Sequence, residues 1–184
     1  MKHLINFQLF NERIDIKDSD SVDVRLAKDK LNSTEDQLNQ YPNLKSKIDS
    51  IYKSNKDKPA SDIYNQVLDF LGKDPKLRNP FAVSYLEVAK LEMEVKKLTD
   101  SILVDESSIK LSTQNLSLAT SNDVKKKMQI DLDRMKNNIS EKKKKLEDTL
   151  KKLNTSRDKV NQEIAKTKKE IIDSSKKISE SDKK

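Results

Sequence analysis

Four consecutive lysines, Lys142, Lys143, Lys144 and Lys145, are the residues of this chain whose type and spacing most directly suggest chemistry. Such a run can contact the phosphates of a nucleic acid or another anionic surface. On a helix, however, the four side chains point around about a full turn, so they cannot form one flat patch. The alternative, a well-hydrated lysine-rich helix that binds nothing, stays open.

Aromatic residues are missing from the whole region around these lysines, because none follows Tyr85. Stacking on exposed bases is therefore not available to this segment. Any nucleic-acid contact would be made to the phosphate backbone and would depend steeply on salt. The same lack of Trp and Phe disfavours binding to a membrane surface.

The residues that catalysis and cofactors require are largely absent. The chain has one histidine, His3, no cysteine and one glycine, Gly72. These counts exclude a Ser-His-Asp triad, a histidine-based metal site and a phosphate-binding glycine loop. The acidic residues that stand close together read as solvated helix faces; they are Glu92, Glu94, Asp131 and Asp133. We therefore predict a protein that is not an enzyme and holds no metal or cofactor.

The composition favours long helices with narrow buried faces. Of the 184 residues, 38% are charged and 33% hydrophobic, and there is no Trp. The formal net charge of +7 is uneven, with −1 over residues 1–121 and +8 over residues 122–184. No segment is apolar enough to span a membrane, and the start does not resemble a secretory signal.

Two ladders of apolar residues spaced by seven predict the fold. The first contains Phe81, Val88, Val95, Ile102, Ile109 and Leu116, and the second contains Leu132, Ile139, Leu146, Leu153 and Val160. If the chain reverses near residues 119–123, the ladders face each other, Leu91 faces Leu150, and Asp105 lies beside Lys136. A sustained seven-residue repeat keeps one side of each helix buried against its partner. The sequence thus predicts an all-α protein with a long antiparallel helical hairpin, a coiled coil, over residues 80–179.

Residues 18–79 are expected to form a small helical module that precedes the hairpin. Ser21 can cap a helix that runs to about Asn39, and a short helix follows Pro42. Ser61 can cap another helix, which Gly72 should end. Asn79 and Pro80 are a favourable start for the first helix of the hairpin. The last residues, 180–184, are expected to fray.

Two groups of apolar residues have no obvious partner in the hairpin. Residues 1–17 alternate apolar and polar side chains, as two short strands would, although a short helix is also compatible. The candidates for docking on another protein are Leu4, Ile5, Phe7, Leu9 and Phe10 at the start and Ile164, Ile171 and Ile178 near the end. Both groups could instead pack on the helical module of the same chain.

The first twelve residues, MKHLINFQLFNE, resemble the starts of small structural proteins of large tailed bacteriophages. The shared features are Met1 and Lys2, an apolar stretch, Phe7 and Phe10, and the acidic Glu12. The resemblance implies a component of a virion or prohead, located in the particle or in the host cytoplasm.

Together these patterns predict a non-enzymatic structural protein, a coiled-coil spacer or clamp within a larger and oligomeric protein assembly. Its partners would be other protein subunits. The alternative is a basic coiled-coil factor that binds or packages nucleic acid through the second half of the hairpin. A helical surface adhesin is a third class, which the missing signal sequence disfavours.

Overall fold

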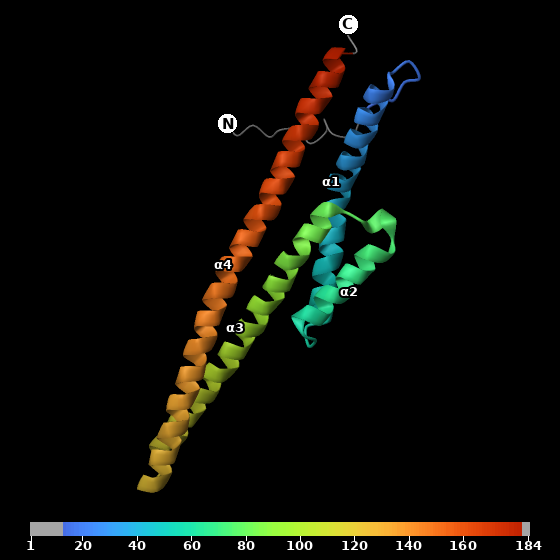
Figure 1. The fold of residues 1–184 in the computed structure, drawn as a ribbon. Helices are drawn as coiled ribbons and strands as arrows, with labels where there is room; N and C mark the ends of the chain where they lie inside the picture. The colour runs from blue at the N-terminus through green and yellow to red at the C-terminus, as the bar shows by residue number, and fades with distance from the viewer. Residues whose placement is uncertain (1–12, 182–184) are drawn as a thin grey trace, which may run out of the picture.

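The computed structural model describes residues 13–181 and shows an all-α protein with two long antiparallel helices (Figure 1). The elements are α1 (Val22–Ser54), α2 (Ala60–Lys73), the short 3₁₀ helix η2 (Pro75–Leu77), α3 (Pro80–Leu118) and α4 (Asn122–Ser181). Helices α3 and α4 form the long hairpin, and α1 and α2 pack beside the part of it that lies away from the turn. The predicted all-α fold with a helical hairpin is thus confirmed.

Helix α3 begins where its capping residues predict. The Asn79 side chain accepts hydrogen bonds from the backbone N–H groups of Phe81 (3.0 Å) and Ala82 (3.2 Å). Pro80 occupies the first position, where a missing N–H costs nothing. Three residues separate Leu118 from α4, whose 60 residues extend over about 90 Å.

Helix α1 is one continuous helix of 33 residues, so the prediction that it ends near Asn39 is wrong. Pro42 lies inside it, although proline removes one backbone hydrogen bond. Pro42 itself is exposed, so water can reach the carbonyl that loses its partner. On either side of it, Tyr41 and Leu44 pack into the hydrophobic core. The burial of these neighbours explains why the helix continues.

Helix α2 differs from the prediction at both ends. It begins after Pro59 rather than after Ser61, and no side chain caps it. Gly72 lies within the last turn and has no positive φ, so it does not end the helix as predicted. The helix ends one residue after Gly72, at Lys73. The carboxylate of the next residue, Asp74, accepts the N–H of Lys76 (2.9 Å) and starts η2.

The described part of the N-terminal segment lies against α1 and is not a strand. The side-chain amide of Asn32 donates to the carbonyl of Ile14, and its oxygen accepts the N–H of Ile14, both at 3.0 Å. One side chain thereby satisfies the backbone groups that a neighbouring strand would have paired. Nearby, Lys28 is buried and paired with Asp20 (3.0 Å). The strand prediction is therefore wrong for residues 13–17.

Side chains from all four α-helices form one hydrophobic core. Its most buried members include Ile48, Ile63, Val67, Leu86 and Val88, and α4 contributes Leu153 and Val160. The ammonium of Lys97 donates to the carbonyl of Lys58 in the connection between α1 and α2. Beyond this point only α3 and α4 continue, as a two-helix projection that we call the arm, residues 98–144 (Figure 1). The α3 part of the arm is about 32 Å long.

Candidate functional site

The facing residues of α3 and α4, here called the seam, contain most of the predicted ladder positions. Eight of the thirteen are buried: Phe81, Val88, Leu91, Ile102, Leu132, Ile139, Leu153 and Val160. Four are half-buried: Val95, Ile109, Leu116 and Leu146. Two of these four, Ile109 and Leu116, lie toward the turn, where no third helix covers the pair. Ile102, Leu132 and Ile139 are nevertheless buried within the arm, so the seam continues along it.

Leu150 does not belong to the seam, which corrects the prediction for this residue. Its side chain is 39% exposed, whereas Thr149 is buried. A helix in a coiled coil alternates steps of three and four residues, and Thr149 lies three residues after Leu146. The Thr149 hydroxyl donates to the carbonyl of Lys145 (2.8 Å), so its burial leaves no unpaired polar group. Hydrophobicity alone favours the leucine.

Two of the four consecutive lysines are held by α3. Lys142 pairs with Asp105 and also donates to Ser101 (2.8 Å), and Lys143 pairs with Glu106 (2.7 Å). The predicted pairing of Asp105 with Lys136 is therefore wrong. Helical side chains lean toward the N-terminus of their own helix. In this antiparallel pair, side chains of α3 lean away from the turn and those of α4 lean toward it. Asp105 therefore meets a lysine that lies farther along α4 than Lys136.

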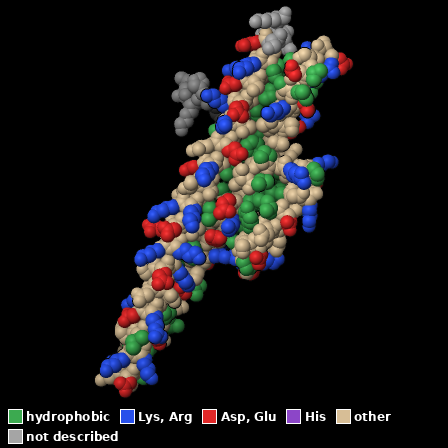
Figure 2. All heavy atoms as spheres, viewed as in Figure 1, with side chains coloured by type: hydrophobic (Ala, Val, Ile, Leu, Met, Phe, Trp, Pro, Cys, Tyr) green, Lys and Arg blue, Asp and Glu red, His purple; other side chains and the backbone are tan. Residues whose placement is uncertain are grey.

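The remaining lysines of the run, Lys144 and Lys145, are exposed and make no ion pair with the described residues. Basic and acidic side chains alternate along the visible surface of α4 (Figure 2). The +8 half of the chain thus forms no continuous basic patch on this face. Contact of these two lysines with an anion stays a prediction.

The late isoleucines of α4 lie within the protein rather than on a free face. Ile171 is buried at 5% exposure, Ile164 packs against the core, and Ile178 is half-buried. The apolar residues of α4 are spaced by seven up to Val160, and the next one, Ile164, follows after four. At this point α4 runs past the start of α3 and contacts α1 (Figure 1). A four-residue insertion shifts the buried side of a helix. Docking of Ile171 on another protein is therefore excluded by its burial.

The five N-terminal docking candidates, Leu4, Ile5, Phe7, Leu9 and Phe10, lie outside the described residues. Their role remains a prediction from the sequence.

A polar network joins α1, α3 and α4 at the edge of the core. The Tyr85 hydroxyl donates to Asp49 (2.8 Å), and Glu92 pairs with Arg157 (2.7 Å). Burial raises the pKa of Tyr85, and the hydrogen bond to Asp49 and the charge of Glu92 add to the effect. Burial likewise raises the pKa of Tyr41 to about 12.

A hollow of about 290 Å³ lies beside this network, with Lys45, Tyr85, Glu92 and Arg157 among its walls. Each charged group there has a partner of opposite charge: Lys45 pairs with Asp49 (3.3 Å) and lies 4.6 Å from the centre of the Tyr85 ring. The cations and carboxylates therefore neutralise one another. This arrangement cross-links three helices and leaves none of the charged groups of the hollow unpaired.

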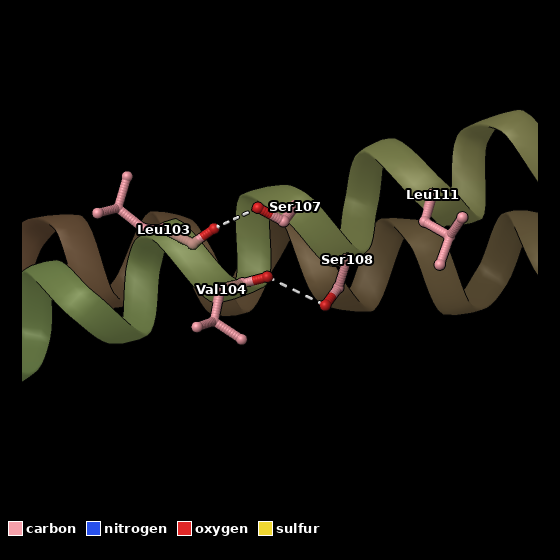
Figure 3. A pocket seen from close by; sticks show the side chains of 5 residues that line it. All are labelled: Leu103, Val104, Ser107, Ser108 and Leu111. Atoms are coloured by element: carbon pink, nitrogen blue, oxygen red, sulfur yellow. Dashed lines mark hydrogen bonds between the residues drawn. The ribbon is translucent and has the colours of Figure 1, made fainter.

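The outer face of the arm is the feature that the seven-residue ladders did not reveal. Four large apolar side chains of α3 are exposed there: Leu103 (57%), Val104 (65%), Leu111 (60%) and Leu118 (78%). Leu103, Val104 and Leu111 line a shallow hollow of about 400 Å³ together with Ser107 and Ser108. Helix α4 passes behind α3 in this view (Figure 3). Val104, Leu111 and Leu118 are themselves seven residues apart, which is the signal that could have identified this face.

The described residues contain no cluster of His, Asp or Glu that could hold a metal ion. No helix among them is long and apolar enough to cross a membrane. No protein family, no curated protein and no solved structure matches the chain. Of the described surfaces, the exposed apolar face of the arm is the main candidate for contact with another molecule.

Proposed function

We propose that this chain is a non-enzymatic structural protein, a coiled-coil spacer or clamp within a larger protein assembly. The observation that carries the proposal is the arm, which extends beyond α1 and α2 and exposes Leu103, Val104, Leu111 and Leu118. The seam gives the arm its length and shape. Exposed apolar residues at this density favour attachment to another protein.

The arrangement of the charged groups supports this reading. The acids and bases that the core brings together, around Tyr85 and Glu92, are bound to one another. A catalytic group instead needs an unsatisfied neighbour and an accessible cleft. The network serves better as a brace that keeps the arm fixed on the helical module.

The resemblance of residues 1–12 to small phage structural proteins supports a virion or prohead as the assembly. The test is purification of the tagged chain from its native source after nuclease and high-salt treatment, followed by mass spectrometry. We expect a stoichiometric set of proteins to remain bound. Loss of every partner under these conditions would contradict an assembly role.

A matched pair of variants sharpens this experiment. Replacing Val95 and Ile102 together by Asp places two carboxylates in the seam and should destroy the hairpin and release the partners. Replacing the exposed Lys144 and Lys145 by Gln should leave the partners bound. Loss of the partners in the lysine variant alone would favour the second function.

The second candidate is a basic coiled-coil factor that binds or packages nucleic acid. The observation that favours it is the net charge of +8 over residues 122–184, with Lys144 and Lys145 exposed. Their replacement by Gln should weaken nucleic-acid binding and reduce its salt dependence. Because Lys142 and Lys143 pair with α3, they are left unchanged in this test, so that the hairpin stays intact.

A further inference from the structure

Residues 13–20, which we call the strap, run back along α1 from its start. The contacts at the far end of the strap form what we call the latch. There the guanidinium of Arg13 pairs with Asp36 (2.6 Å), and the Asn32 amide bonds to both backbone groups of Ile14. The ion pair is accessible to water, because the side chains of Arg13 and Asp36 are 74% and 43% exposed. Water and salt therefore compete with the latch.

The other end of the strap is fastened by a buried ion pair, which we call the hinge. The Asp20 carboxylate pairs with Lys28 (3.0 Å), and the two side chains are only 7% and 1% exposed. The same carboxylate accepts the backbone N–H of Lys17 (2.9 Å). Arg25 donates to the carbonyl of Asp20 (3.0 Å). Separating a buried ion pair is costly, so the hinge should hold when the latch opens.

The strap can move without disturbing the hydrophobic core. Of the described residues, Tyr41 is the first that belongs to the core, so the core includes no residue of the strap. Ile14 is only half-buried and Ile16 is 42% exposed, so little apolar surface holds the strap in place. Segments with few buried apolar contacts open locally, at a lower free energy than the whole fold.

We infer that the strap is a flap that opens at the latch and stays fixed at the hinge. This inference rests on the proposed assembly function, because the strap directly follows residues 1–12, which contain the N-terminal docking candidates. With the latch closed, Arg13 is fixed beside Asp36. With the latch open, residues 13–19 can carry Arg13 roughly 20 Å from Asp20. The latch thus controls where the docking segment starts and how far it reaches.

Hydrogen exchange of backbone amides in the full chain tests the flap. The Ile14 N–H, which bonds to Asn32, reports on the latch, and the Lys17 N–H, which bonds to Asp20, reports on the hinge. The Tyr52 N–H reports on the core part of α1. Relative to an unfolded chain, we expect protection to be lowest at Ile14, higher at Lys17 and highest at Tyr52. Equal protection of Ile14 and Tyr52 overturns the inference, as does equal protection of Ile14 and Lys17.

A pair of matched variants tests the latch itself. Asp36→Asn removes its ion pair and should speed exchange of the Ile14 N–H about three- to fivefold, as expected for an exposed ion pair, without changing the Lys17 N–H. Asp15→Asn removes the same charge from an exposed strap residue that makes no ion pair with a described residue, and it should change neither rate. Equal effects of the two variants overturn the latch. Faster exchange of the Lys17 N–H in Asp36→Asn overturns the hinge, because the strap then opens as a whole.

Failure of the flap is distinguishable from failure of the proposed function. A strap that opens only with the whole protein leaves the stoichiometric partners of the nuclease and salt experiment in place. Loss of those partners, in turn, leaves the exchange rate of the Ile14 N–H in the purified chain unchanged.

Discussion

Ile102 and Val104 lie two residues apart on α3 and face opposite ways, so they provide a matched test of the seam. Ile102 is 6% exposed and Val104 is 65% exposed. Truncating a buried isoleucine to alanine costs about 2–5 kcal/mol. Because a single partner helix covers this part of the arm, we expect Ile102→Ala to cost about 2 kcal/mol, at the lower end of that range. We expect Val104→Ala to stay within about 0.5 kcal/mol.

The assay is native-state hydrogen exchange of the full chain. A loss of about 2 kcal/mol should speed exchange of the arm amides on the order of thirtyfold. Amides of α1 should be little affected, because local opening of the arm leaves the core packed. Equal exchange rates in the two variants would refute the assignment of Ile102 to the seam and of Val104 to the outer face.

Three further predictions concern the seam register and the buried tyrosines. Leu150→Lys should change the free energy of unfolding by less than about 0.5 kcal/mol, whereas Leu153→Lys should cost several kcal/mol because Leu153 is only 3% exposed. Urea denaturation measures both changes. A larger loss in Leu150→Lys than in Leu153→Lys would place Leu150 in the seam. The buried Tyr52 hydroxyl has no hydrogen-bond partner among the described residues, so Tyr52→Phe should stabilise the protein by about 1 kcal/mol in the same assay, and a loss of stability would indicate a partner. Because burial raises the pKa of Tyr41 to about 12, its neutral hydroxyl stabilises the folded state fully below pH 10, and this stabilisation is lost as the pH rises through 12. Thermal unfolding across this range should show a smaller loss of stability at alkaline pH in Tyr41→Phe than in the wild type.

The hairpin could be predicted from the sequence because its physical cause is a simple repeat. Apolar residues every seven positions, an Asn-Pro start and a short polar turn all agree over residues 80–118 and the facing part of α4. The choice between Thr149 and Leu150 could not be made in this way. It depends on the phase of the alternating three- and four-residue steps, and a hydroxyl that bonds to its own helix can be buried at little cost.

The helical module was less predictable because tertiary packing outweighed local signals. Pro42 ordinarily ends a helix, yet burial of its neighbours carries α1 through it. The outer face of the arm was missed for a different reason. A spacing of seven does not say which of two apolar sides of a helix is buried: Ile102 lies in the seam, whereas Val104 begins a second spacing of seven on the same helix that is exposed.

The change of spacing between Val160 and Ile164 also bears on how the chain folds. Near the turn, α4 meets residues of α3 that precede it by only a few positions, whereas its last third reaches α1, more than a hundred residues earlier. Short loops close sooner than long ones. During synthesis, therefore, the hairpin can form from its turn before the last third of α4 packs on α1. Until then the side of α1 that α4 will cover is exposed, and a holdase chaperone could bind it.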